Sequence, residues 1–230
     1  MVYTTLPGFF ITFEGSEGCG KSTQIVRLAQ ELQRNKNNGS SLREVVVLRE
    51  PGSTALGEKI RSLLQYDEAS FAMARETELL LFAASRAQLV QEIIRPALAR
   101  GAIVLCDRFL DSTTVYQGVA RALRKNDVAT INHFAAGGLL PDVTILLDLK
   151  SSVGRERMRA RNAENFVIDR MEQEPEAFYE DVRHGYLKLA AQQPNRFIVV
   201  DASQTSEKIA QEIMEKIEPR LVNAPLYPFT

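Results

Sequence analysis

One short glycine-rich segment, Gly15–Ser22, restricts the fold of this chain more than any other feature. It spells Gly-Ser-Glu-Gly-Cys-Gly-Lys-Ser and fits the pattern GxxxxGK(S/T). The apolar run Phe9–Phe13 comes just before it, and a helical pattern begins at Ser22. Between a strand and a helix, such glycines let backbone N–H groups surround phosphates, while the lysine reaches the β and γ oxygens and the serine hydroxyl binds Mg²⁺. The segment therefore predicts a nucleoside triphosphate site.

The motif also predicts which residues form that site. The residues expected to contact ATP are Gly15, Ser16, Glu17, Gly18, Cys19, Gly20, Lys21, Ser22 and Thr23. Glu17 is unusual there, because a carboxylate repels a triphosphate. We expect Glu17 to contact a substrate hydroxyl on the far side of the phosphates, the alternative being a loop residue that faces solvent.

A carboxylate at the end of a second strand is expected to complete the Mg²⁺ site with Ser22. Two apolar runs end in aspartate, at Asp107 and Asp148, and hydrophobic periodicity cannot choose between them. Asp107 is the favoured ligand because Arg108 follows it, and the carboxyl ends of strands are where α/β sheets bind ligands. We interpret Asp148 as the more structural of the two.

Apolar runs and helical patterns alternate along the whole chain. The expected strands are Phe9–Phe13, Val45–Leu48, Ala102–Cys106, Val143–Leu149 and Phe197–Val200. The expected helices are Ser22–Arg34, Met73–Arg95 (bent or restarted at Pro96), Asp127–Ala136, Ser152–Arg161, Glu176–Gln192 and Ser206–Ile217. Continuous apolar strands separated by helices indicate a parallel sheet that is covered on both faces. We expect an α/β fold, the three-layer P-loop NTPase fold, with a five-stranded parallel sheet, helices on both faces and a small mobile lid.

Composition supports a single domain over residues 1–230. Hydrophobic residues make up 45% of the chain and charged residues 25%, with no compositional break. The net charge of −1 gives no support to a nucleic-acid polymer or a membrane as partner. Two cysteines and two histidines exclude a disulfide framework and a His-rich metal site. With no signal-peptide pattern and no stretch of about 18 apolar residues, a cytoplasmic location is expected.

Further polar side chains are expected to bind an acceptor substrate. Arg49 follows the second expected strand and could hold a second phosphate, the alternative being a turn with a solvated ion pair. Phe82 and Arg86 are four residues apart on one helix face, which suits stacking on a base and contacting its edge. Taken alone, Phe82 in an apolar helix is more often a core residue. The stretch 112–118 adds several hydroxyls and an amide soon after Arg108.

A dense run of arginines predicts a lid over about residues 155–174. The run consists of Arg155, Arg157, Arg159 and Arg161. Arg157 and Arg161 lie one helical turn apart and can point the same way. The phosphate loop has no arginine of its own, so lid arginines are expected to offset the charge of a transferring phosphoryl group. For a single arginine, a solvated helix face would be the simpler interpretation.

Together these segments resemble the thymidylate kinases, P-loop nucleoside monophosphate kinases that phosphorylate dTMP with ATP. The resemblance runs from Phe10 to about Ile217. The matching stretches are 13–22, 49–52 (Arg-Glu-Pro-Gly), 81–86 (Leu-Phe-Ala-Ala-Ser-Arg), 107–108, 112, 116–118, 169–172 (Asp-Arg-Met-Glu) and 201–204 (Asp-Ala-Ser-Gln). Positions 16–19 contain no arginine, which matches the bacterial form of the family. The stretch 162–168 looks longer than the compact bacterial pattern, so the resemblance leaves open which lid arginine reaches the phosphates.

The resemblance implies roles for the acceptor-site residues. Phe82 would stack on thymine and Arg86 would bond its exocyclic oxygen, with Thr113 and Gln117 at the base edge. The implied substrate-binding residues are Glu17, Arg49, Phe82, Arg86, Arg108, Ser112, Thr113, Tyr116 and Gln117. The expected catalytic residues are Lys21, Glu17, Arg108, Arg157 and Arg161.

The resemblance also implies how the sugar and phosphate are held. Arg108 and Arg49 would bind the monophosphate, Glu17 would bind the 3′-hydroxyl, and Tyr116 would disfavour a 2′-hydroxyl. Family members are typically homodimers through the helix that here spans about 73–95. Three rival hypotheses remain at this stage: a kinase for another monophosphate such as dUMP or dGMP, a slow ATPase switch, and a degenerate scaffold.

Overall fold

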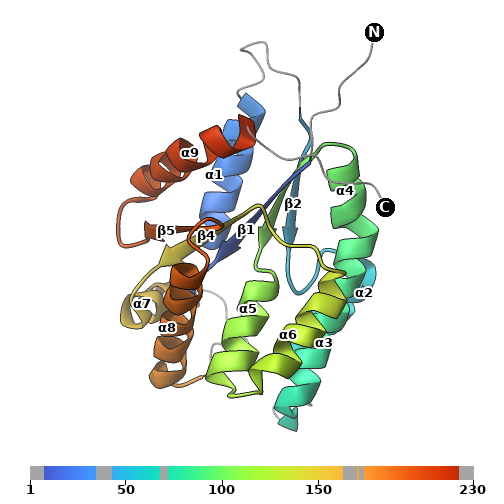
Figure 1. The fold of residues 1–230 in the computed structure, drawn as a ribbon. Helices are drawn as coiled ribbons and strands as arrows, with labels where there is room; N and C mark the ends of the chain where they lie inside the picture. The colour runs from blue at the N-terminus through green and yellow to red at the C-terminus, as the bar shows by residue number, and fades with distance from the viewer. Residues whose placement is uncertain (1–7, 35–42, 68–71, 163–169, 171–173, 223–230) are drawn as a thin grey trace.

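The computed structural model describes residues 8–34, 43–67, 72–162, 170 and 174–222 (Figure 1). Two expected features lie outside these described residues: most of the lid (163–169 and 171–173) and the side chain of Arg161. The predictions made for them therefore stay predictions.

Five parallel strands form one sheet in the order β2-β3-β1-β4-β5. They are β1 (Phe9–Glu14), β2 (Val45–Arg49), β3 (Ile103–Asp107), β4 (Val143–Asp148) and β5 (Phe197–Asp201). Asp107 at the end of β3 is in register with Phe13 on one side and Arg49 on the other. The predicted five-stranded parallel sheet is confirmed, and the carboxyl ends of its strands meet at one edge.

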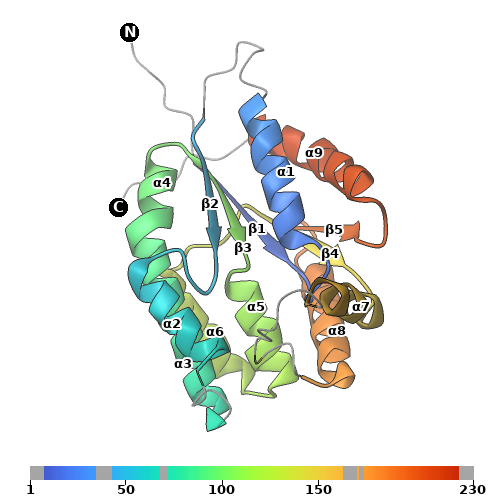
Figure 2. The same ribbon diagram turned by 180° about the vertical axis from the view of Figure 1, so that it is seen from behind.

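Helices cover both faces of this sheet. They are α1 (Lys21–Arg34), α2 (Ala55–Gln65), α3 (Arg75–Leu89), the π-helical turn η3 (Val90–Ile94), α4 (Arg95–Ala99), α5 (Leu110–Val115), the π-helical turn η4 (Tyr116–Ala120), α6 (Lys125–Ala136), α7 (Ser151–Asn162), α8 (Glu176–Gln192) and α9 (Ser206–Val222). Figures 1 and 2 show α1 and α9 side by side on one face, with the α3–α4 and α8 groups on the other. The expected three layers are present.

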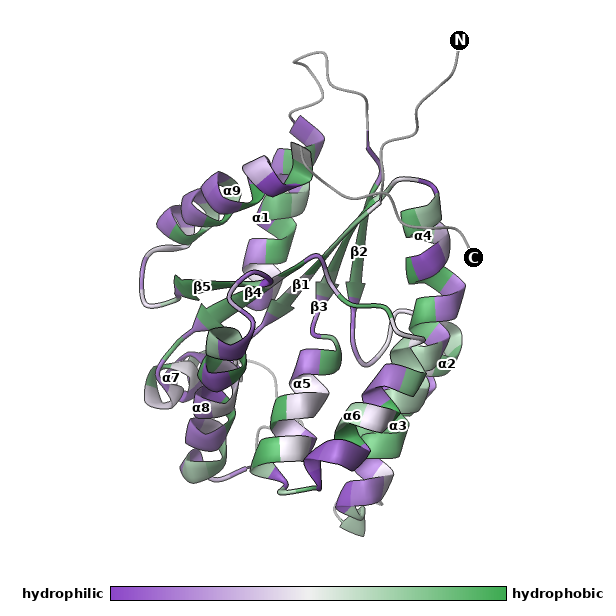
Figure 3. Ribbon diagram, viewed as in Figure 1, coloured by the Kyte–Doolittle hydropathy of each residue, from purple (hydrophilic) through white to green (hydrophobic). Residues whose placement is uncertain are grey.

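The two faces have separate apolar cores because successive side chains of a strand point in opposite directions. Phe9, Ile11 and Phe13 pack beneath α1 and α9, whereas Phe10 packs toward η3 and α4 on the other face. Leu146 of β4 joins a third cluster under α8. In Figure 3 the strands are almost uniformly hydrophobic, as a doubly covered sheet requires. Each fully buried side chain of this kind stabilises the fold by about 1.5–3 kcal/mol.

Two helical segments were not expected from the sequence. α2 begins where the Thr54 hydroxyl accepts a hydrogen bond from Gly57 N at 2.9 Å, a side-chain cap within a turn that looks like loop sequence. α5 carries two threonines and a valine, which have weak helix propensity, and tertiary packing overrides that preference. The long helix does restart near Pro96, which occupies the first turn of α4 after the π-helical turn η3.

Candidate active site

The glycine-rich segment forms an open loop between β1 and α1. Gly15, Gly18 and Gly20 have φ angles of 138°, 73° and 95°, a region that glycine enters without steric cost. A Cβ added to Gly20 would meet nothing within 4 Å, so the space in front of this backbone is open. The loop lines a cavity of about 620 Å³ that extends to β2, α3, α5 and α9. A strand-loop-helix arrangement beside an open cavity suits phosphate binding.

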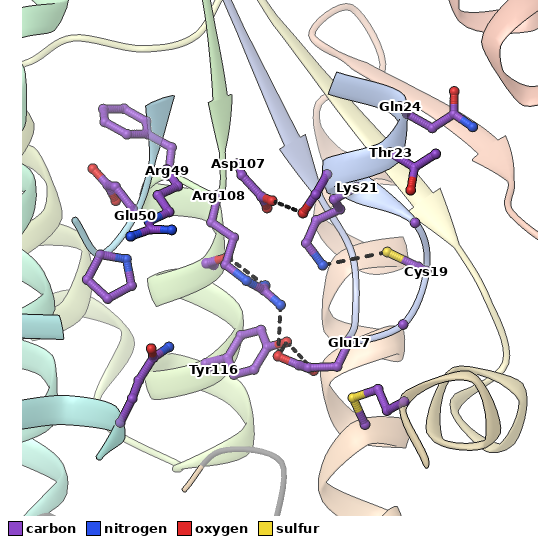
Figure 4. Close-up of a pocket in the computed structure, with 18 of the residues that line it drawn as sticks. Glu17, Cys19, Lys21, Thr23, Gln24, Arg49, Glu50, Asp107, Arg108 and Tyr116 are labelled. Carbon is purple, nitrogen blue, oxygen red and sulfur yellow. Dashed lines mark hydrogen bonds and ion pairs between the residues drawn. The ribbon is translucent and has the colours of Figure 1, made fainter. Parts of the chain in front are cut away.

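Lys21 is buried at the first turn of α1 and reaches back over the loop (Figure 4). Its Nζ donates to the carbonyl oxygens of Gly15 (3.1 Å) and Ser16 (2.9 Å), and it lies 3.6 Å from Cys19 Sγ. These neutral acceptors leave the ammonium charge without a carboxylate partner in the described residues. Its positive charge is therefore available to phosphate oxygens.

The structure distinguishes between the two aspartates, Asp107 and Asp148, that the sequence left as alternative Mg²⁺ ligands. Asp107 Oδ2 accepts a hydrogen bond from the Ser22 hydroxyl at 2.8 Å inside the cavity. Asp148 instead forms a two-point ion pair with Arg183, at 2.7 and 3.0 Å. A hydroxyl and a carboxylate facing one another suit Mg²⁺, which prefers oxygen ligands and keeps waters and phosphate oxygens as the others. The geometry therefore favours Ser22 and Asp107 as its protein ligands.

Glu17, Arg108 and Tyr116 form one hydrogen-bonded group at the centre of the cavity (Figure 4). Arg108 donates to Glu17 Oε1 at 2.8 Å, and the Tyr116 hydroxyl lies 2.9 Å from both carboxylate oxygens. The Arg108 guanidinium also lies over the Tyr116 ring, 5.0 Å from its centre. Arg108 adopts φ +70°, a conformation unusual for a non-glycine residue. This backbone turn directs the guanidinium into the cavity.

Glu14, at the end of β1, supports this group from behind. It is fully buried and accepts hydrogen bonds from Phe109 N (2.8 Å), Ser112 (2.6 Å) and Tyr186 (2.7 Å). Burial, with the nearby charge of Asp111, raises the pKa of Glu14 to about 7. Ser112 and Tyr186 in turn contact Arg108 at 3.1 and 3.4 Å. Tyr186 was not anticipated from the sequence, because nothing in α8 marks that position.

Phe82, Arg86, Thr113 and Gln117 line one side of the same cavity, as predicted. Arg86 is almost wholly buried, and its guanidinium binds acceptors on four residues. These contacts are Glu50 (3.0 Å), Asn132 (2.7 Å), Thr113 (2.9 Å) and Phe109 O (3.3 Å). Among the described residues they leave one Nη1 N–H of Arg86 without a partner. Arg86 thus holds four neighbouring residues together and can still donate one hydrogen bond to a ligand.

The turn after β2 brings Arg49 and Glu50 to the cavity. Arg49 is half exposed and pairs with Glu58 at 2.9 Å, so the solvated ion pair considered from the sequence is present, and Arg49 lines the cavity as well. Glu50 is buried against Arg86, and burial raises its pKa to about 7 despite that ion pair. Its Oε1 has no hydrogen-bond partner in the described residues.

The helix α7 lies directly against the phosphate loop. A Cβ added to Gly154 would come within 2.5 Å of the Glu17 carbonyl oxygen, and one added to Gly18 would collide with the Gly154 backbone. This contact brings Arg157 into the cavity wall, where it donates to Ala202 O at 3.2 Å. Arg155 lies 3.9 Å from Glu176.

At the far end of the cavity the lining includes Gln204, Ser206 and Ile209 from the β5–α9 connection. Gln204 belongs to the stretch 201–204 that resembles the family in the sequence. Gln24 of α1 donates to the Ser206 hydroxyl at 3.2 Å and ties this end to the phosphate loop. The expected ATP-contacting residues from Glu17 to Thr23 also line the cavity.

Comparison with known proteins agrees with this geometry. A family model described as "Thymidylate kinase" matches residues 13–213. The chain belongs to the thymidylate kinase family. Thymidylate kinases from Geobacter sulfurreducens and Pseudomonas putida are 47% and 46% identical to it, covering 93% and 90% of this chain and 98% and 94% of theirs. A crystal structure of thymidylate kinase from Ehrlichia chaffeensis matches with a TM-score of 0.71 at 30% identity, over 92% of this chain and 99% of that one.

Membership of the thymidylate kinase family confirms the enzyme class and the P-loop fold expected from the sequence. Within the described residues of this family member, no helix is both long enough and apolar enough to cross a membrane. The individual residue roles, the homodimer and the cytoplasmic location stay predictions.

Proposed function

We propose that this protein transfers the γ-phosphoryl group of ATP to dTMP, giving ADP and dTDP for deoxynucleotide synthesis. One observation carries the proposal. A single cavity contains the phosphate loop at one end and Phe82, Arg86 and Gln117 at the other. A switch ATPase or a scaffold has no need of that second end.

At the ATP end, the loop backbone and Lys21 hold the phosphates, and Ser22 and Asp107 would hold Mg²⁺. A bound Mg²⁺ would supply positive charge against the charge that develops on the β and γ oxygens. Arg157, and Arg161 from the end of α7, are the lid cations that offset the remaining charge. We treat residues 1–230 as one domain with this lid at about 155–174.

At the acceptor end, Phe82 stacks on thymine, Arg86 donates its remaining N–H to a base oxygen, and Thr113 and Gln117 contact the base edge. Arg108 and Arg49 bind the monophosphate, with the Ser112 hydroxyl beside Arg108. The Glu17 carboxylate, fixed by two neighbours, accepts a bond from the sugar 3′-hydroxyl.

The transfer itself needs little covalent help from the protein. An anionic oxygen of the dTMP phosphate attacks the γ-phosphorus in line, and the bond to the β–γ bridging oxygen breaks as ADP leaves. Because that oxygen is already negative, no strong general base is required. The protein positions both phosphates and stabilises spread negative charge with Lys21 and Arg108.

The test is ADP release from Mg²⁺-ATP with dTMP, dUMP, dGMP, dCMP or UMP added singly. Strong stimulation by dTMP alone is the expected result. Stimulation by a different monophosphate would keep the phosphate chemistry and reject the proposed base site. Release that ignores every acceptor would indicate an ATPase switch.

We also infer a homodimer through the helix that spans about 73–95. Leu80 of α3 is 56% exposed and Phe134 of the adjacent α6 is 86% exposed, which is unusual for large apolar side chains on neighbouring helices. Light scattering of the purified protein should give about twice the 25.7 kDa chain mass. A monomer at micromolar concentration would reject this interface.

A further inference from the structure

A buried carboxylate, Glu78, lies directly behind the base-binding side of the cavity. It occupies α3 one helical turn before Phe82, and the residue is only 1% exposed. The sequence did not single it out, and it does not line the cavity. Its nearest ligand-facing neighbour is Gln117, whose Nε2 donates to Glu78 Oε1 at 2.8 Å.

Two arginines keep Glu78 charged. Arg121 donates to both carboxylate oxygens at 3.3 Å, and Arg170 also pairs with the carboxylate. Burial alone would raise the pKa of Glu78, but the hydrogen bonds from Gln117 and Arg170 and the charge of Arg121 hold it below its ordinary value. Glu78 is therefore an ionised group that only accepts hydrogen bonds.

Because the Glu78 carboxylate can only accept hydrogen bonds, it fixes the orientation of the Gln117 amide. The NH₂ group must point at Glu78, because the amide oxygen would be repelled by the carboxylate. The amide oxygen Oε1 then has no hydrogen-bond partner within the described residues, yet it is not sealed from solvent. Since Gln117 lines the cavity, this oxygen is the polar atom that it offers to a ligand.

We propose that Glu78 is a positioning residue that sets base specificity by presenting the Gln117 side chain as a hydrogen-bond acceptor. The inference rests on the proposed function and deepens it. A thymine or uracil ring carries an N–H between two carbonyl oxygens, so it can donate to Gln117 Oε1 and accept from Arg86. A cytosine ring has an unprotonated nitrogen at that position and an amino group beside it. Its ring nitrogen would face the Gln117 oxygen, acceptor against acceptor, and its amino group would face the Arg86 N–H, donor against donor.

The backbone around Gln117 supports this assignment. Gln117 lies in the π-helical turn η4, where Arg121 N bonds to Tyr116 O at 2.8 Å. The adjacent Tyr116 holds Glu17 at the sugar side of the cavity. One short turn thus supplies the sugar contact and the base-edge contact, while Glu78 and Arg121 anchor it from outside.

The decisive variant is Glu78→Gln, which keeps the size of the side chain. An amide at position 78 can both donate and accept, so Gln117 can then turn either end toward the base. We expect the ratio of kcat/KM for dTMP to that for dCMP to fall about tenfold or more, with the KM for ATP changed less than twofold.

Matched variants separate this role from a structural one. Glu78→Asp, which stays an acceptor only, should retain most of the wild-type ratio. Glu76→Gln, an exposed neighbour on α3, should leave the ratio unchanged. In a Gln117→Leu background, Glu78→Gln should produce no further change in the ratio.

The proposal is overturned if folded Glu78→Gln keeps the wild-type ratio within twofold, or if both acceptors lose activity in parallel as the melting temperature falls. If wild-type protein shows no preference for dTMP, the proposed function itself fails, which is a different outcome. Should Glu78→Gln not fold, nitrogen-15 NMR of the wild type decides. The Gln117 Nε2 protons, assigned by their loss in Gln117→Leu, should be protected from exchange without nucleotide, and rapid exchange would reject the proposal.

Discussion

The two ends of the cavity recognise their substrates by different means. The ATP end is centred on one continuous segment, Gly15–Ser22, whose glycines at 15, 18 and 20 have positive φ angles. The acceptor end is assembled from side chains of α3, α5, η4 and the turn after β2. There the ligand-facing side chains depend on buried partners, as Arg86 depends on Glu50 and Gln117 on Glu78.

This difference predicts two kinds of mutational damage. A backbone site depends on loop shape, so replacing one of its side chains removes chemistry and leaves the fold intact. A site held by buried ion pairs joins function to stability, because removing one partner leaves an unpaired charge. The following predictions test this contrast.

The largest effect is expected at the ATP end. Lys21→Ala should lower kcat by about 10³-fold, because a cation aimed at transferring phosphate is lost. The melting temperature should stay close to that of wild type, since the hydrogen bonds of Lys21 within the described residues go to neutral groups of the loop itself, Gly15 O, Ser16 O and Cys19 Sγ. Steady-state kinetics and thermal unfolding measure both, with the exposed Lys125→Ala as control. Near-full activity would reject the phosphate-loop assignment.

At the acceptor end, Arg86→Ala should damage selection and stability together. It strands the buried Glu50 carboxylate, which is expected to lower the free energy of unfolding by about 3–5 kcal/mol. The KM for dTMP should rise more than the KM for ATP. The exposed pair of Arg100 and Glu44 provides the comparison, because Arg100→Ala should cost less than about 1 kcal/mol. Equal stability losses in the two variants, measured by urea unfolding, would contradict the contrast.

A third substitution tests the contact between helix α7 and the phosphate loop. Gly154→Ala places a methyl group against Glu17 O and must push α7 away from the phosphate loop. Overpacking of this kind costs about 1–3 kcal/mol, so turnover should fall roughly tenfold if the contact is needed in the active state. The exposed Ser152→Ala on the same helix should have no effect, and full activity of Gly154→Ala would show that the contact is dispensable.

The smallest effect concerns pH. The pKa of Glu14 is about 7 in the folded protein, above its unfolded value of 4.5, so the folded state holds more protons between these values. Its contribution to stability is present below pH 4.5 and is lost as pH rises through 7. In Glu14→Gln, the unfolding free energy should therefore fall less between pH 4.5 and 7 than in the wild type, by about 1–3 kcal/mol. Glu50 titrates in the same range, so part of the fall should remain. An unchanged slope in urea unfolding from pH 5 to 7.5 would exclude Glu14 as a contributor.

The same contrast explains what the sequence could predict. The strands follow from continuous apolar runs, and the phosphate loop follows from eight adjacent residues. α2 was missed although Gly57, Ile60 and Leu64 are buried at helical spacing, because its start depends on the Thr54 cap in a turn-like stretch. α5 was missed because tertiary packing overrides its weak helix propensity. Glu78 and Tyr186 escaped notice because their partners Gln117 and Glu14 are 39 and 172 positions away along the chain. Only the fold brings such pairs together.

The meeting of Gly18 and Gly154 has an evolutionary consequence. When two bulky side chains touch, a gain in size at one position can be relieved by a loss at the other. Glycine has no side chain to shorten, so neither position can compensate for a larger side chain at the other. Relatives that carry a side chain at one of these positions are expected to differ in backbone path, with α7 set farther from the loop. A larger residue at one of these two positions therefore cannot be offset by a substitution at the other. It would require a change in the backbone, such as an insertion or a different lid arrangement.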